Sequence, residues 1–385
     1  MHNSRSAVGV NQRRVACVNQ PVGQNHVIGR IAPSPTGRMH IGNAYAALAA
    51  WLGARAAGGL VRLRIEDIDG PRVVPDADRW IQDDLAWLGL DWDGPVVYQS
   101  QRVDLYREAL RRLEAQSLRL EEARPVVGVD TALRTLIYPC FCSRADIRAA
   151  SAPNEGDGFI VYPGTCRRLP PSVARERVEA GRRHAFRIAV PDEGRFGSIC
   201  EFRDKVYGLQ SYDLPRQVGD VVLLRSDGLV SYQLAVSVDD LEMGISQVVR
   251  GRDLLRSTAI QLWVRRRLLF RQREGGPANS MRTVSIEDTK VPQVEWAHLP
   301  LVDGADGRRM SKRFGSLDLG SLREAGVAPE QVVGLCAWLL GLTERPEPAS
   351  PSSLLPRFSW EQVRANLEDR LLTHEALAAA GIRVQ

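Results

Sequence analysis

The chain has 385 residues, of which 44% are hydrophobic and 25% charged, so it can bury at least one substantial core. This composition excludes a chain that is disordered throughout. No stretch approaches the roughly 18 consecutive apolar residues of a membrane helix, and residues 1–30 lack the apolar segment of a secretory signal. We therefore expect a cytoplasmic protein with no membrane partner. The formal charge of +5 suits a polyanionic partner without requiring one.

The first half of the chain alternates strand-like and helical patterns after a polar segment, residues 1–27. Residues 27–32 predict a buried strand, 40–59 an alanine-rich helix that ends at Gly58 and Gly59, and 60–65 a second strand. Strand, turn, helix and strand in this order form a βαβ unit, which predicts a parallel sheet covered by helices. Two amphipathic helices are predicted next, over residues 77–88 and 102–113.

Residues 118–200 break this pattern with prolines and three clustered cysteines, which predicts an inserted subdomain. The main sheet is expected to resume afterwards. A helix over residues 329–342 and a Pro/Ser-rich stretch follow. The segments predicted to rebuild the sheet are strands at 220–225, 229–238 and 244–251, with a helix over 257–270.

The run RIAPSPTGRMHIGN, residues 30–43, leads from the first strand through a proline-rich turn into the first helix. His40 falls at the start of this helix, where free backbone N–H groups and the positive end of the helix dipole favour a phosphate group. The alternative is an ordinary turn with a solvated histidine.

A second motif, RMSKR at residues 309–313, lies in a glycine-flanked loop. A mobile loop with Lys312 and an adjacent serine can close over a triphosphate and stabilise the charge that develops there. Taken alone, the motif is equally typical of a basic surface loop.

Together these two motifs resemble the paired signatures of class I aminoacyl-tRNA synthetases, and RIAPSPTG, LRIEDID, SYQLAVSVDD and VVRGRDLL resemble the glutamyl branch. The resemblance covers residues 29–342. It implies an α/β fold: a Rossmann-like parallel sheet with an inserted zinc-bearing subdomain and a short helical C-terminal region. It also implies an enzyme that joins glutamate and ATP, with Mg²⁺, into glutamyl-adenylate and passes the glutamyl group to a tRNA.

The resemblance assigns roles to individual residues. His40 and Lys312 are the expected catalytic residues, and Gly42 and Asn43 join them in binding ATP. The residues expected to bind glutamate are Arg30, Ala32, Ser34, Glu66, Tyr232 and Arg250. A substrate with two carboxylates and one ammonium needs guanidinium groups and one carboxylate, so the residue types agree with this assignment. Without the family context, Glu66 could lie in a solvated acidic turn or a metal site, and Arg30 and Arg250 could form ion pairs at the sheet edge.

Two positions depart from the signatures. Asn43 stands where a second histidine is expected, which retains an amide donor, and Arg309 replaces the first lysine of the loop motif, which retains the charge. We expect the site to remain active with these two residues in formation of glutamyl-adenylate and in transfer of the glutamyl group.

Cys140, Cys142 and Cys166 have a spacing that can close on one tetrahedral Zn²⁺. The alternative is three buried free thiols. The fourth ligand could be His184 or water, whereas the resemblance to shortened glutamyl enzymes implies Tyr162. The metal is expected to be structural, stabilising a small insertion.

Residues 314–385 are too few for an anticodon-reading module of roughly 100 to 200 residues. The resemblance is therefore to the shortened glutamyl paralogues that esterify the queuosine base at the wobble position of tRNA(Asp). Two alternatives stay open: a minimal enzyme that charges the 3′ end of tRNA(Glu), and a zinc-stabilised tRNA-binding protein without catalysis. A monomer is expected. The predicted division is a flexible tail 1–27, catalytic core 28–117, inserted acceptor and zinc subdomain 118–200, core 201–300, signature loop and stem-contact region 301–345, and C-terminal tail 346–385.

Overall fold

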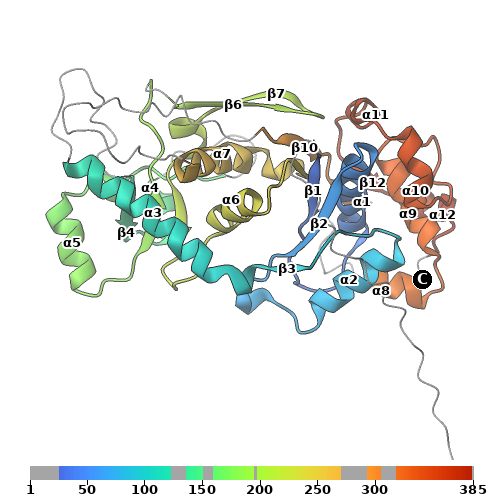
Figure 1. Ribbon diagram of the computed structural model, residues 1–385, viewed down its shortest axis with the longest axis horizontal. Coiled ribbons are helices and arrows are strands. Elements are labelled where there is room, and N and C mark those ends of the chain that lie inside the picture. The colour runs from blue at the N-terminus through green and yellow to red at the C-terminus, as the bar shows by residue number, and fades with distance from the viewer. Residues whose placement is uncertain are drawn as a thin grey trace, which may run out of the picture.

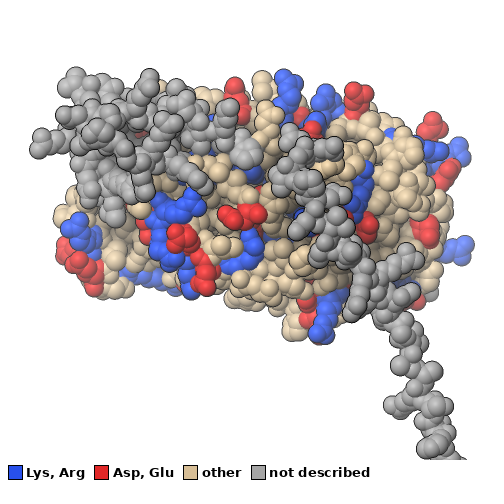
Figure 2. Space-filling view, viewed as in Figure 1, with Lys and Arg blue, Asp and Glu red and all other residues tan. Residues whose placement is uncertain are grey.

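The computed structural model describes residues 26–122, 136–150, 159–194, 197–269, 293–304 and 318–383. They form an elongated molecule with the small inserted sheet at one end of the long axis and the C-terminal helices at the other (Figure 1). On the face shown in Figure 2, basic and acidic side chains are interspersed among neutral ones. None of the described helices combines the length and the apolar character that crossing a membrane requires.

Seven strands form the main sheet in the order β3-β2-β1-β9-β10-β6-β7. Every neighbouring pair is parallel except the β6–β7 hairpin. From β1 the order runs to β2 and β3 on one side and to β9, β10, β6 and β7 on the other, so the strand order reverses at β1 as in a doubly wound sheet, and this confirms the predicted Rossmann-like α/β fold. The strands are β1 (Ile28–Ile31), β2 (Leu60–Ile65), β3 (Val97–Tyr98), β6 (Ile199–Asp204), β7 (Gly208–Asp213), β9 (Gln247–Gly251) and β10 (Glu295–Leu299).

Helices cover the sheet on both sides, and in Figure 1 strands β1 and β2 lie between α1 on the right and α6 on the left. Two large clusters of buried apolar side chains correspond to the two sides. The helices are α1 (Ile41–Ala56), α2 (Ala77–Trp87), α3 (Val103–Glu122), α4 (Arg144–Ala150), α5 (Pro171–Glu179), α6 (Tyr232–Glu242), α7 (Leu255–Leu269), α8 (Leu319–Glu324), α9 (Pro329–Leu339), α10 (Pro351–Leu354), α11 (Trp360–Arg364) and α12 (His374–Ala379).

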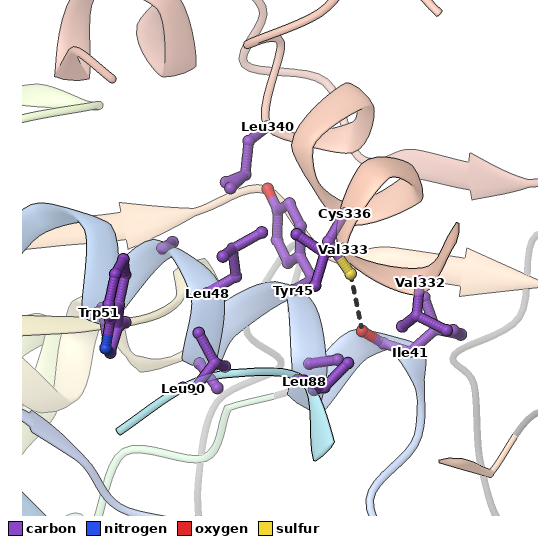
Figure 3. Close-up of a cluster of buried hydrophobic side chains, with 14 of the residues drawn as sticks. Ile41, Tyr45, Leu48, Trp51, Leu88, Leu90, Val332, Val333, Cys336 and Leu340 are labelled. Carbon is purple, nitrogen blue, oxygen red and sulfur yellow. Dashed lines mark hydrogen bonds between the residues drawn. The ribbon is translucent and has the colours of Figure 1, made fainter. Parts of the chain in front are cut away.

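Helix α1 packs against α9 through a dense apolar contact (Figure 3). Ile41, Tyr45 and Leu48 of α1 point toward Val333 and Cys336 of α9, and all five are buried. The alanine-rich sequence of α1 lets neighbouring elements approach closely, so the helix is buried along most of its length. This packing fixes the start of α1, which carries the first signature motif.

The small sheet is antiparallel and contains β4 (Ile137–Cys140), β5 (Ala185–Ile188) and β8 (Val221–Leu224), in that order. The run 220–225 was predicted to rejoin the main sheet. That prediction is wrong, because β8 pairs with β5 and completes the small sheet instead. The main sheet gains β6 and β7 from residues between these strands, so the chain passes between the two sheets more than once.

The run 229–238 was predicted to be a strand, and this is also wrong, because residues from Tyr232 onward form helix α6. Ser231 caps the helix by accepting a hydrogen bond from the N–H of Leu234 at 3.4 Å. Residues 234–240 are all buried, because the helix lies between the sheet and helices α3 and α7. A helix without an exposed polar face lacks the 3.6-residue periodicity that identifies amphipathic helices.

The C-terminal residues fold back onto the segment that precedes the loop signature. Strand β12 (Arg370–Leu372) pairs in parallel with β11 (Val302–Gly304). The carboxylate of Asp369 accepts a hydrogen bond from the N–H of Leu301 at 2.8 Å and from Nε of Arg252 at 2.6 Å. The C-terminal segment therefore holds the chain in place just before the loop signature.

Candidate active site

The predicted glutamate-binding residues gather at the carboxyl ends of the central strands. Arg30 lies on β1, Glu66 follows β2 directly, Arg250 lies on β9, and Tyr232 begins α6. Ligand sites of open α/β sheets form at this edge. A cleft of about 970 Å³ opens here, and its lining includes Ser34, Glu66 and Tyr232. Ala32 is half-buried and is not among the residues that line the cleft.

Arg30 and Arg250 are buried, and neither is among the residues that line the cleft, although Arg250 contacts Tyr232, which lines it. Nη1 of Arg30 donates to the carbonyl oxygen of Val249 at 2.9 Å, and Nη1 of Arg250 donates to the hydroxyl of Tyr232 at 3.4 Å. Burial lowers the pKa of Arg30 to about 10, although the nearby carboxylate of Asp240 opposes this shift. Arg30 therefore stays cationic at neutral pH, and guanidinium groups of this kind bind carboxylates.

Glu66 supplies the negative charge of the pocket. Its Oε1 accepts a hydrogen bond from Nη2 of Arg64 at 2.9 Å, and its backbone N–H donates to the carbonyl of Pro33 at 3.0 Å. Burial raises the pKa of Glu66, and the guanidinium of Arg64 limits that rise. A substrate ammonium at this carboxylate would supply a second cation and favour the ionised form.

Sequence reasoning missed the buried charged groups that form ion pairs behind Glu66. The fully buried guanidinium of Arg64 donates to Asp240 at 2.8 Å and lies 3.7 Å from a carboxylate oxygen of Asp239. Asp239 in turn accepts hydrogen bonds from Gln99, Arg102 and Tyr106. The signal was the acidic pair in SVDD inside an apolar run, since buried carboxylates require cationic partners.

His40 is the N-cap of α1, as predicted, and two hydrogen bonds, one to its side chain and one from its backbone, hold it there. Nδ1 accepts from the N–H of Gly42 at 3.1 Å, and Oδ1 of Asn43 accepts from the N–H of His40 at 3.0 Å. The N–H of Gly42 is therefore engaged rather than free. Because Nδ1 accepts, the proton of the neutral ring lies on Nε2, and burial lowers the pKa of His40. A Cβ at Gly42 would lie 3.0 Å from the imidazole ring, so glycine permits this arrangement.

Residues 309–313, including Lys312, lie outside the described residues. The chain on both sides of them lies beside the start of α1. Asp318 forms a β-bridge with His40, and the N–H of Leu319 donates to the carbonyl of Met39 at 2.8 Å. On the other side, Val302 reaches within 4.0 Å of the position that a Cβ at Gly42 would take.

The three predicted cysteine ligands meet in the small sheet. The sulfur atoms of Cys140, Cys142 and Cys166 lie within 4.8 Å of one another. The hydroxyl of Tyr162 lies 3.4 Å from the sulfur of Cys140 and 3.7 Å from that of Cys142. His184 is not part of this group, and its Nδ1 contacts the carbonyl oxygen of Arg182 at 2.8 Å instead.

The spacing of these atoms fits a tetrahedral metal site. Bonds of about 2.3 Å to sulfur imply sulfur atoms about 3.8 Å apart, and the sulfurs of Cys142 and Cys166 are 3.5 Å apart. The guanidinium of Arg187 lies 3.9 Å from the ring centre of Tyr162 and adds positive charge beside the phenol. Cys140 and Cys142 also line the 970 Å³ cleft, so one hollow extends from the glutamate pocket to the cysteine cluster.

Comparison with known proteins places this geometry in a family. The family profile "tRNA synthetases class I (E and Q), catalytic domain" matches residues 26–121 and 132–349. Glutamyl-Q tRNA(Asp) synthetase of Symbiobacterium thermophilum is 43% identical over 348 residues, which are 87% of this chain and 93% of that protein. The protein of the same name from Geobacter sulfurreducens is 44% identical over 303 residues, 78% of this chain and 80% of that protein.

A solved glutamate-tRNA synthetase from Elizabethkingia anophelis has a similar fold, with a TM-score of 0.66 and 25% sequence identity. The match covers 91% of this chain and 68% of that one. The sequence profile, the curated relatives and the solved structure thus agree with the family that the motifs indicate. We conclude that the chain belongs to the class I tRNA synthetases of the E and Q group and that it is a ligase of that family.

Proposed function

We propose that this ligase activates glutamate with ATP and transfers the glutamyl group to the queuosine base at the wobble position of tRNA(Asp). The observation that carries the proposal is the pocket at the carboxyl ends of β1, β2 and β9. Glu66 and Tyr232 line one end of the cleft, and the buried guanidinium groups of Arg30 and Arg250 lie behind them, close enough for Arg30 to act on the charge of Glu66 and for Arg250 to donate to Tyr232. This charge pattern is complementary to an amino acid that has a second carboxylate.

In the first step, an oxygen of the glutamate α-carboxylate attacks the α-phosphorus of ATP, and the bond to pyrophosphate breaks. Arg30 and Arg250 hold the substrate carboxylates, while Glu66 holds the ammonium and Tyr232 and Ser34 complete the pocket. His40 presents its Nε2–H toward the nucleotide, because the N–H of Gly42 occupies Nδ1. Mg²⁺ would supply positive charge to the phosphates.

Lys312 is proposed to neutralise charge on the departing pyrophosphate. Support comes from Val302 and Asp318, which flank the loop signature and lie beside the start of α1. In the second step, a hydroxyl of the queuosine cyclopentenediol attacks the acyl carbon of the mixed anhydride, and AMP leaves. Neither step requires a nucleophile from the protein.

We further propose that Cys140, Cys142, Cys166 and Tyr162 hold one structural Zn²⁺. Three thiolates and one phenolate would give the four ligands of a closed site, with no position left for a substrate. The sulfur and oxygen distances described above support this assignment. The metal would connect β4 to the loop that contains Tyr162 and Cys166.

Glutamate-dependent exchange of pyrophosphate into ATP tests the first step. Glu66→Gln should raise the KM for glutamate more than tenfold, because the ammonium loses its ionic partner, whereas the exposed Glu242→Gln should behave as the unaltered enzyme. Lys312→Ala should nearly abolish exchange, with Lys205→Ala as the control. An unaltered enzyme that shows no exchange would favour a tRNA-binding protein without catalysis.

Transfer to different acceptors tests the second step. Acid gels should show glutamyl transfer to tRNA(Asp) that carries queuosine, and none to tRNA(Asp) that lacks it or to tRNA(Glu). Charging of tRNA(Glu) alone would instead identify a minimal glutamyl-tRNA synthetase. The names of the curated relatives favour the queuosine acceptor.

A further inference from the structure

A buried histidine lies next to the substrate-binding guanidinium of Arg250. His298 is on β10, and the parallel register pairs it with Arg250 on β9. Paired residues of adjacent strands point to the same side of a sheet, so the two side chains lie together. His298 is completely buried. It does not line the cleft and has no part in the mechanism proposed above.

Asp204 fixes the tautomer of His298. One oxygen of its carboxylate, at the end of β6, lies 2.7 Å from Nδ1 of His298. The same carboxylate accepts hydrogen bonds from the backbone N–H groups of Val206 and Tyr207, each at 2.9 Å, and from that of His298 at 3.1 Å. A carboxylate surrounded by donors is an acceptor, so the ring proton lies on Nδ1 and Nε2 has a free lone pair.

That lone pair faces Arg250. Nε of Arg250 donates to Nε2 of His298 at 3.1 Å, and Nη2 donates to the hydroxyl of Thr258 at 2.7 Å and to the carbonyl oxygen of Leu254 at 3.4 Å. The hydroxyl of Thr258 also lies 3.1 Å from Nε2 of His298. Nη1 donates to the hydroxyl of Tyr232 at 3.4 Å, and Tyr232 lines the cleft. Protein acceptors thus hold Nε and Nη2 of the guanidinium, and Nη1 makes only the 3.4 Å bond to Tyr232 among the described residues.

We propose that His298 is a positioning residue that holds Arg250 in the orientation required to bind a carboxylate of the substrate. This inference rests on the proposed activation of glutamate and extends it to a residue that touches no substrate. Asp204 orients the imidazole, the imidazole accepts from Nε, and Nη1 of Arg250 reaches Tyr232 at the wall of the pocket. An arginine has several accessible rotamers, so without this acceptor the guanidinium would sample orientations that do not meet the carboxylate.

The charge state of His298 agrees with this role. Burial lowers its pKa to about 4, and the charge of Arg250 acts in the same direction, whereas the hydrogen bond to Asp204 opposes the shift. The charged groups that act on it are Asp204 on β6, Arg250 on β9 and Arg30 on β1. The ring is therefore neutral at physiological pH, and Nε2 remains an acceptor.

Two conservative variants test separately the hydrogen bonds made by the two ring nitrogens of His298. The amide oxygen of His298→Gln can take the place of Nε2 and accept from Arg250, whereas His298→Asn can donate to Asp204 but presents no acceptor to Nε. We expect His298→Asn to raise both the KM and the calorimetric Kd for glutamate by about ten- to a hundredfold, the range for a hydrogen bond to a charged group. The KM for ATP and kcat should change less than about threefold, and His298→Gln should restore the glutamate constants to within about threefold.

A purely structural role would give a different pattern. It would lower the melting temperature and the active fraction and leave the glutamate KM unchanged, so unfolding curves are recorded for each variant. If neither His298 variant folds, the test is repeated at Thr258, whose hydroxyl accepts from Nη2 of Arg250. Thr258→Val should raise the KM for glutamate, whereas Thr258→Ser, which keeps the hydroxyl, should not.

Folded His298→Asn with an unaltered glutamate KM and Kd would overturn the inference while leaving glutamate activation intact. An unaltered enzyme that neither binds glutamate nor exchanges pyrophosphate would overturn the proposed function, and this inference with it.

Discussion

Removing the buried cation below the pocket should destabilise the whole protein. Arg64 is completely buried and donates to Asp240 at 2.8 Å and to Glu66 at 2.9 Å. Arg64→Met keeps most of the side-chain volume but leaves both carboxylates without this partner. Breaking a buried ion pair from one side costs about 3–5 kcal/mol, against a total of about 5–15 kcal/mol for a typical domain. We therefore expect Arg64→Met to lower the free energy of unfolding, measured in urea, by about 3–5 kcal/mol.

The dependence of this loss on pH distinguishes lost charge pairing from lost packing. Burial already raises the pKa of Glu66 above its unfolded value, and removal of Arg64 would raise it further. The folded variant would then take up a proton that the unfolded chain does not, so its deficit should shrink between pH 8 and pH 5.5. The double variant Arg64→Met/Glu66→Gln should recover part of the loss for the same reason.

A surface pair provides the matched control. Arg111 forms an ion pair of 2.7 Å with Glu108 on α3, and both side chains are more than half exposed. Arg111→Met should therefore change the free energy of unfolding by less than about 1 kcal/mol. If Arg64→Met costs no more than this control, or if its deficit is the same at both pH values, the account of a buried charge network is wrong.

Three further predictions concern other parts of the molecule. Because folded His298 has a pKa of about 4 and the unfolded residue about 6.5, the unfolding free energy should fall by up to about 3 kcal/mol as the pH drops through this window; urea curves of His298→Gln should lack this component, and identical pH profiles would contradict it. Cys142→Ser should reduce bound zinc, measured by elemental analysis, from about one ion per chain to almost none, whereas Cys200→Ala should keep it; equal zinc in both variants would exclude the proposed ligand. A Cβ at Gly334 would overlap the carbonyl oxygen of Glu347, so Gly334→Ala should cost about 1–3 kcal/mol in thermal unfolding, and an unchanged melting temperature would show that the backbone adapts freely.

The sequence predicted those elements whose ends are marked by local signals. Strand β2 was predicted over its observed residues, and α1 ends as predicted before Gly58, which adopts the left-handed conformation. Glycine and proline act through the backbone of their own neighbourhood, so they can be interpreted without the rest of the fold. The same reasoning placed His40 at the start of α1.

Features that depend on distant partners could not be predicted in this way. Helix α6 was mistaken for a strand because its environment buries it on all sides. The partners of Arg64 on α6 and of His298 on β6 come from separate parts of the chain. A single sequence without the fold gives no reason to pair such residues. For the three cysteines that we propose as metal ligands, local spacing was sufficient to predict the cluster that the structure forms.

The pairing of β11 with β12 has a consequence for synthesis of the protein in the cell. Strand β12 is translated long after β11, and elongation at about 5–20 residues per second makes the interval on the order of several seconds. During this interval β11 has no strand partner, and Asp369 is not yet available to Leu301. A nascent chain from which β12 has not yet emerged would therefore lack the brace before the loop signature, and ligase activity should first appear after translation has passed β12.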